Sequence, residues 1–284
     1  MEIFHSPEEI NEWSLRERQA GQLIGFTPTM GALHDGHASL MMTSQADNTR
    51  NVASIFVNPL QFNNSQDLDS YPRTLESDID IAREAGIDAL YIPSVSAMYP
   101  DGFSTVITAG SLTDTMEGAH RPGHFDGVAT VVVKLLNAVN PHTAYFGEKD
   151  FQQLAVIRRV VADLNISCRI IGIPTIRHSD GLAMSSRNVR LTSEHRQQCP
   201  IIYSALQRCA SQSLISSIDS EALKQLFTNE IQTLSDGRVE YIEIVKSDTL
   251  EPHDVFNESC TICVAVWFGD VRLIDNISHH SNND

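Results

Sequence analysis

Short apolar runs alternate with longer amphipathic segments along the first 175 residues. The apolar runs are typical of strands buried on both faces of a parallel sheet. They lie at residues 23–26, 52–57, 89–92, 144–146 and 169–173, and a further short strand is predicted at 104–108. The segments between them predict helices. These helices lie within residues 1–20, at 38–46, 74–85 and 127–139, and from the 147–154 turn to about residue 164. The alternation predicts an α/β fold with a Rossmann-like, mostly parallel sheet and helices on both faces.

The pattern changes at Pro174. A polar loop is predicted at 180–188, followed by helices at 192–211 and 220–234 and by strands at 239–245, 261–267 and 272–275. This order predicts a smaller α+β unit. We therefore expect two domains, at residues 1–175 and 176–284, and a frayed polar end at 278–284.

The charge balance restricts the partners of the chain. Its 284 residues carry a formal net charge of −16, which argues against nucleic acid and anionic membranes as partners. No apolar run reaches the length of a membrane span, and we expect no secretory leader. The five scattered cysteines are typical of reduced thiols, so we expect a cytoplasmic protein. Cys260 and Cys263 have CxxC spacing, but strand alternation predicts that they face opposite ways, and no residue set predicts a metal site.

The strongest candidate for a functional site lies at residues 27–40. There a predicted strand leads into a loop broken by Pro28, Gly31 and Gly36, and a helix follows. A helix N-terminus presents free N–H groups that attract phosphate. His34 and His37 could add hydrogen bonds that strengthen as charge builds in a transition state. The alternative is two surface histidines in a loop, but the glycines and the strand–loop–helix setting favour a phosphate site.

Three further segments carry candidate polar groups. Asn58 and Gln61 follow the predicted second strand, at the end of a parallel strand where ligands bind. Lys149 stands at a predicted helix start and can reach a phosphate, although a Lys-Asp pair there is more often a cap and a solvated charge. The 180–188 loop offers hydroxyl and guanidinium donors. Residues 63–71 are polar and predict a mobile loop that is a candidate lid.

These segments carry a resemblance to a known family. His-Asp-Gly-His at 34–37 resembles the HxGH motif of the nucleotidyltransferase superfamily, and the longer string 28–37 resembles the pantoate–β-alanine ligases, also called pantothenate synthetases. Four later strings are similar to motifs of the same family. They are FVNPLQF at 56–62, EGAHRPGHF at 117–125, GEKDFQQL at 147–154 and MSSRN at 184–188, the last resembling a KMSKS-type loop with Arg187 in the lysine place. One departure is His178, where the family usually has Glu.

The resemblance implies an activity and a set of roles. The activity is condensation of (R)-pantoate with β-alanine, with ATP going to AMP and diphosphate through a pantoyl-adenylate. His34 and His37 would be catalytic, with His37 at the position that the family labels proton donor. Gln61 and Gln153 would bind pantoate, and Gln61 and Asn58 would bind β-alanine. ATP would be bound by Met30, Gly31, Ala32, Leu33, His34, Asp35, Gly36, His37, Gly147, Glu148, Lys149, Asp150, Ile176, Met184, Ser185, Ser186 and Arg187.

The family also implies Mg²⁺ brought by ATP, with few direct protein ligands, and a homodimer. Three alternatives remain open at this point. Another nucleotidyltransferase would want extra basic groups for a phosphorylated acceptor rather than paired glutamines. A truncated tRNA synthetase conflicts with the net charge of −16. A non-catalytic nucleotide sensor would not need every phosphate-binding string.

Overall fold

The computed structural model describes residues 1–215, 218–257 and 259–279 and contains two sheets. The larger sheet has six strands in the order β1-β4-β3-β2-β5-β6, and every neighbouring pair is parallel. The strands are β1 Glu2–Phe4, β2 Ile24–Thr29, β3 Arg50–Ile55, β4 Ala89–Tyr91, β5 Thr143–Gly147 and β6 Arg169–Ile173. The chain moves outward from β2 to β3 and β4, and then returns to place β5 on the other side of β2. This reversal creates a crevice at the carboxyl ends of β2 and β5.

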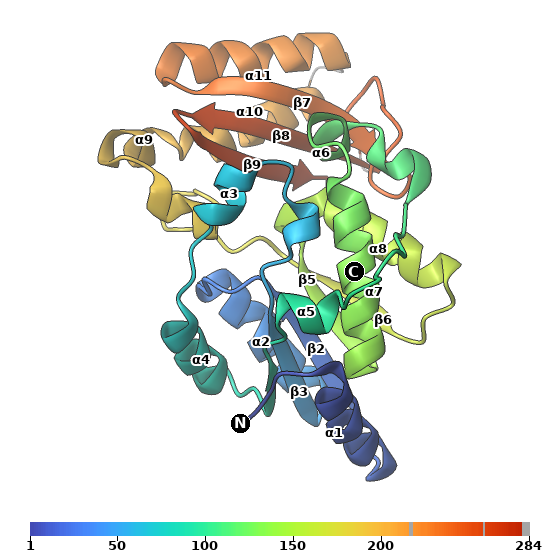
Figure 1. The fold of residues 1–284 in the computed structure, drawn as a ribbon. Coiled ribbons are helices and arrows are strands. Elements are labelled where there is room, and N and C mark those ends of the chain that lie inside the picture. The colour runs from blue at the N-terminus through green and yellow to red at the C-terminus, as the bar shows by residue number, and fades with distance from the viewer. Residues whose placement is uncertain (216–217, 258, 280–284) are drawn as a thin grey trace.

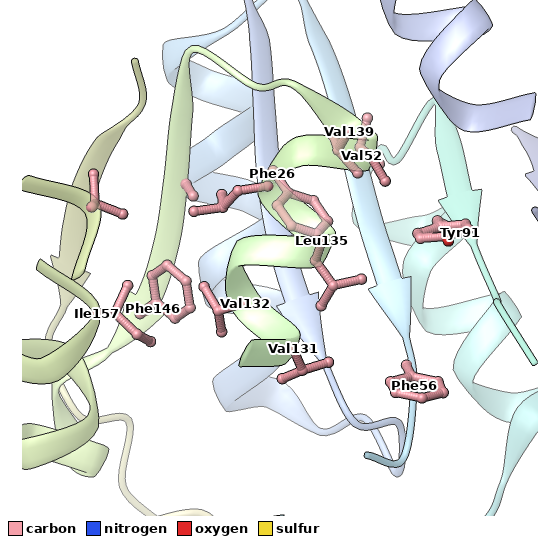
Figure 2. Close-up of a cluster of buried hydrophobic side chains, with 14 of the residues drawn as sticks. Phe26, Val52, Phe56, Tyr91, Val131, Val132, Leu135, Val139, Phe146 and Ile157 are labelled. Atoms are coloured by element: carbon pink, nitrogen blue, oxygen red, sulfur yellow. The ribbon is translucent and has the colours of Figure 1, made fainter. Parts of the chain in front are cut away.

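Helices cover both faces of the parallel sheet (Figure 1). One face packs against α1 Pro7–Gln19, α7 His124–Val139 and α8 Phe151–Asp163, and the other against α2 Asp35–Asp47 and α4 Leu75–Glu84. Figure 2 shows the α7 side of this core. There Val132, Leu135 and Val139 of the helix meet Phe26 and Val52 of the strands. Because helices cover the apolar residues of β2, β3, β4 and β5, these strands could be recognised as continuous apolar runs.

The smaller sheet is antiparallel, in the order β7-β8-β9. Its strands are β7 Arg238–Lys246, β8 Cys260–Phe268 and β9 Val271–Ser278, and the helices that precede them in the chain are α9 Ser193–Gln198, α10 Ile201–Ile215 and α11 Ser220–Leu234. One face packs on α10 and α11, whereas the other packs towards Met116 and Phe151 of the larger unit. Cys260 belongs to the first face and Cys263 to the second, which confirms the prediction that they face opposite ways. In Figure 1 this sheet lies beyond the carboxyl ends of the parallel strands.

Several predicted elements were wrong in detail. Residues 104–108 form no strand, because the backbone N–H of Ile107 is bound by the Thr130 hydroxyl rather than by a neighbouring strand. The predicted loop at 63–71 contains α3 Ser65–Asp69, which Asn64 caps. The predicted helix at 192–211 is two helices, α9 and α10, on either side of Pro200.

Other elements were missed or displaced. The loop predicted at 117–125 contains α6 Met116–His120, and α7 begins at His124, earlier than predicted. β1 and α5 Val95–Met98 were not predicted. The frayed end predicted at 278–284 lies mostly outside the described residues, and the domain boundary after residue 175 stays a prediction. In the part of the chain that the structure describes, no helix is long and apolar enough to cross a membrane.

Candidate active site

The predicted site segments converge on two connected cavities between the two sheets. The inner cavity, of about 220 Å³, lies over the carboxyl ends of β2, β3 and β5. The outer cavity, of about 630 Å³, lies between α3, α6 and the antiparallel sheet. Residues that line both are Arg121, His124, Lys149, Asp150, Gln153, Ser185 and Arg187. The two cavities therefore form one cleft whose junction carries several cationic side chains.

Most predicted site residues line the inner cavity. They are Met30, His34, Gly36, His37, Asn58, Gln61, Gly147, Lys149, Asp150, Gln153, Ile176, Met184, Ser185, Ser186 and Arg187. Five predicted ATP-binding residues do not line it, namely Gly31, Ala32, Leu33, Asp35 and Glu148. Segments from residue 30 to residue 187 thus meet around one space, as strand ends in a parallel sheet allow.

The two histidines cap the helix that follows them. The backbone N–H of Gly36 donates to His34 Nδ1 at 3.1 Å, and the backbone N–H of His34 donates to His37 Nδ1 at 3.3 Å. A backbone N–H can only donate, so both Nδ1 atoms are acceptors and each neutral ring carries its proton on Nε2. The ring centroids are 4.2 Å apart and both rings line the inner cavity. The backbone therefore fixes two imidazole N–H donors side by side.

Burial and charge keep both rings neutral. Burial, helped by the Lys149 ammonium, lowers the pKa of His34 from 6.5 to about 4. Burial, His34 and Lys149 lower the pKa of His37 from 6.5 to about 3. Protonation would also remove the Nδ1 lone pair that each ring uses as a cap. At neutral pH the pair therefore offers hydrogen-bond donors rather than positive charges.

A buried carboxylate shapes the loop before the histidines. Gly31 and Ala32 have φ of +79° and +48°, and in this turn the N–H groups of Ala32 and Leu33 point to the same carboxylate. Asp78 of α4, 1% exposed, accepts from the N–H of Ala32 at 3.0 Å and of Leu33 at 2.8 Å. Asp78 was not predicted as a site residue, since a carboxylate in an amphipathic helix ordinarily faces solvent. This contact explains why residues 31–33 support the cavity without lining it.

Hydrogen bonds fix both the side chain and the backbone carbonyl of Gln61. Asn58 Nδ2 donates to Gln61 Oε1 at 3.1 Å, and Gln61 Nε2 lies 2.8 Å from Met30 Sδ. The Gln61 carbonyl accepts from His124 Nδ1 at 2.8 Å and from Arg121 Nη2 at 3.2 Å. His124 must donate through Nδ1, so its Nε2 accepts from Arg121 Nη1 at 3.2 Å. Burial, with help from Arg121, lowers the pKa of His124 to about 4, so this ring also stays neutral.

Asn58 is fully engaged within the protein. Its second amide hydrogen goes to the Gly127 carbonyl at 3.1 Å, and Oδ1 accepts from the Tyr99 hydroxyl at 2.7 Å. At 1% exposure it lines the cavity but has its polar atoms occupied. Contact of Asn58 with β-alanine stays a prediction. The geometry shows that Asn58 orients the Gln61 amide.

An ion-pair cluster closes the other side of the cleft. Arg187 and Arg190, both in the short helix η4 Ser186–Arg190, each lie 3.0 Å from a different oxygen of Asp67 in α3. Burial raises the pKa of Asp67, but Arg187 and Arg190 outweigh it and hold that pKa below its ordinary value. Ser185 caps η4 by accepting from the N–H of Arg187 at 3.3 Å. The predicted loop at 63–71 thus contacts the MSSRN loop directly.

The cleft can now be compared with known proteins. The family model for pantoate–β-alanine ligase matches residues 2–278. The chain belongs to the pantoate–β-alanine ligase family. It is 43% identical to the pantothenate synthetase of Acetivibrio thermocellus, covering 98% of this chain and 99% of that one. It is 46% identical to that of Syntrophotalea carbinolica, covering 97% and 98%.

Solved structures of the same family agree with the fold. Pantothenate synthetase from Thermus thermophilus is 41% identical, with a TM-score of 0.92, and the match covers 99% of this chain and 100% of that one. Pantoate–β-alanine ligase from Francisella tularensis, complexed with β-γ ATP and β-alanine, is 36% identical with a TM-score of 0.84, covering 99% of both. The predicted family and fold class are therefore confirmed. This pantoate–β-alanine ligase joins pantoate to β-alanine and uses ATP as a substrate.

Proposed function

We propose that ATP and pantoate meet in the inner cavity and react in two steps. In the first, a pantoate carboxylate oxygen attacks the α-phosphorus and the bond to diphosphate breaks, giving pantoyl-adenylate. In the second, the β-alanine amine attacks the acyl carbon, loses a proton, and AMP leaves. Free carboxylate is a poor acylating agent, so the adenylate supplies the leaving group. The similarity over nearly the full length of pantothenate synthetases favours this scheme over the three alternatives considered from the sequence.

The observation that carries the proposal is the pair of neutral imidazoles beside an ammonium. His34 and His37 each present Nε2–H in the inner cavity, and the Lys149 ammonium is close enough to lower the pKa of both rings. Such preorganised donors stabilise charge that develops on phosphoryl oxygens in the transition state. A ring with a pKa of about 3 does not store a proton at neutral pH. This supports electrostatic stabilisation by His37 rather than proton donation.

The remaining roles are proposed from the residues that line the two cavities. ATP is proposed to contact the segments 30–37, 147–150 and 184–187, with Ile176 beside them. Within the described part of the chain, Gln61 Nε2 donates to Met30 Sδ, a weak acceptor, so it can exchange this sulfur for a pantoate oxygen. Gln153 lines both cavities and is proposed as the second pantoate contact. β-Alanine is proposed to bind next to Gln61, with Asn58 orienting that amide.

Mg²⁺ is proposed to accompany ATP. Among residues 1–215, 218–257 and 259–279, no group of three or more His, Cys, Asp or Glu side chains could hold a metal ion. The donor set fits an ion held chiefly by phosphate oxygens and water, with the Asp150 carboxylate as a protein ligand. When bound, such an ion neutralises phosphate charge and favours departure of diphosphate. We also propose a homodimer, which light scattering would detect as twice the 31.5 kDa chain mass.

Isotope exchange tests the two-step scheme. Labelled diphosphate should exchange into ATP when pantoate and Mg²⁺ are present and β-alanine is absent, because the first step needs no amine. Exchange should disappear when pantoate is omitted. If exchange strictly requires β-alanine, the stepwise order is refuted. If exchange proceeds without pantoate, AMP must be carried by the protein itself, and the proposed residue roles fail.

A further inference from the structure

A side chain of the antiparallel sheet reaches the turn that carries Lys149. Asn276 lies on β9, which contacts both the short helix η3 Glu148–Asp150 and η4. Its Nδ2 donates to the Glu148 carbonyl and to the Lys149 carbonyl, each at 2.9 Å. An amide nitrogen has two hydrogens, so both are used on this one turn. The contact spans 128 and 127 residues of sequence and ties the smaller sheet to β5 and α8.

Asn276 is itself held in place. Its backbone N–H donates to Asp275 Oδ1 at 2.8 Å. Asp275, 4% exposed at its side chain, accepts from both Nη atoms of Arg177, at 2.6 and 2.9 Å. The Arg177 guanidinium lies 3.5 Å from the centre of the Tyr203 ring. Asn276 is 9% exposed and lines the outer cavity, and both of its amide hydrogens are bound to carbonyls, so the loss of these hydrogen bonds is costly.

The turn that Asn276 holds sets the position of an ammonium group. Lys149 is 18% exposed at its side chain and lines both cavities. Among the residues that the structure describes, its ion-pair partner is Asp150, whose Oδ1 lies 3.5 Å from Lys149 Nζ, which is a loose contact. Lys149 therefore depends on its backbone to direct the side chain towards His34 and His37. Small displacements of a positioned group cost large factors in binding and rate.

We propose that Asn276 is a positioning residue for Lys149. By binding the carbonyls of the two peptide groups that flank the Lys149 Cα, it fixes the direction in which the ammonium side chain leaves the backbone towards the two imidazoles. The smaller sheet is then a permanent part of the phosphate site rather than only a cover over it. This inference rests on the proposed function, in which Lys149 binds the triphosphate.

A double-mutant cycle tests the proposal through the affinity for an ATP analogue, and turnover gives a second readout. The dissociation constant of a non-hydrolysable ATP analogue is measured by calorimetry for the parent, Asn276→Ala, Lys149→Met and the double variant. Asn276→Ala should weaken binding by about tenfold in the parent and by less than about twofold once Lys149 is Met. In turnover, the KM for ATP should rise while the KM for pantoate stays unchanged. Asn229→Ala, at an exposed position of α11 that lines neither cavity, is the matched control.

The outcomes separate this proposal from the proposed function. An equal loss of affinity in both backgrounds, or no loss from Asn276→Ala, overturns the positioning role even if Lys149→Met weakens binding as expected. If Lys149→Met leaves affinity unchanged, the phosphate role of Lys149 falls and the positioning role falls with it. Should Asn276→Ala fail to fold, Asn276→Ser is measured in the same cycle. Its hydroxyl offers one donor in place of two and adds no charge, so its loss of affinity should lie between about twofold and tenfold in the parent and fall below about twofold once Lys149 is Met.

Discussion

His37 offers the sharpest test of the site, because one ring has two separable contacts. Its Nδ1 caps α2 by accepting from the N–H of His34, and its Nε2–H is the proposed donor to phosphate. Asparagine can place an oxygen near the Nδ1 position, whereas glutamine can place an N–H near the Nε2 position. His37→Asn therefore removes the donor and keeps the cap, whereas His37→Gln removes the cap and keeps the donor. His37→Ala removes both.

The magnitudes follow from the two contacts. Loss of one preorganised donor lowers kcat by about 10²–10³. Loss of a helix cap lowers the free energy of unfolding by about 1 kcal/mol. His37→Asn should thus unfold at nearly the parent urea concentration but turn over about 10²–10³ times more slowly. His37→Gln should lose about 1 kcal/mol of stability and retain more activity than the other two. His37→Ala should show both losses.

The assay is single-turnover release of diphosphate at saturating ATP and pantoate, beside urea unfolding of each variant. Because the pKa of His37 is about 3, its titration should not change the rate of the parent between about pH 5.5 and about pH 8. Near-parent turnover in His37→Asn would refute the donor role. A rate that follows a group titrating near 6.5 in the parent but not in His37→Gln would instead identify His37 as a proton donor.

Two further predictions concern substrate selectivity and acid stability. Gln61→Ala and Gln153→Ala should each raise the KM for pantoate far more than the KM for ATP, since a lost hydrogen bond costs about 1–3 kcal/mol; equal increases in both KM values would contradict the assignment. His34, His37 and His124 have folded-state pKa values of about 4, 3 and 4, below the ordinary 6.5. The unfolded chain therefore binds protons first as pH falls below 6.5, and each histidine lowers the free energy of unfolding by up to about 1.4 kcal/mol per pH unit until its folded pKa is reached. Urea unfolding at several pH values should show this decline, and His124→Gln should reduce it.

The local sequence determined most of the elements, including the helix start at His34 that is proposed to bind phosphate. Apolar runs buried between two helical layers identify β2 to β6, and short-range signals such as Ser6-Pro7 locate the start of α1. The motif strings also placed the predicted site residues at strand ends, which a parallel sheet brings to one edge. The strand predicted at 104–108 is absent from the structure. A strand forms only if another segment pairs with it, and the local sequence does not report whether such a partner is present.

The connections that tune the site were decided only by tertiary structure. Asp78 binds the loop before His34 from 45 residues away, and His124 clamps the Gln61 carbonyl across 63 residues. Asn276 reaches the Lys149 turn across 127 residues. Periodicity and capping signals extend over a few residues, so they cannot report such pairs. The lowered pKa values of His34 and His37 likewise arise from burial and from the nearby Lys149 ammonium. The fold creates both the burial and the proximity of Lys149, so neither can be predicted from the local sequence.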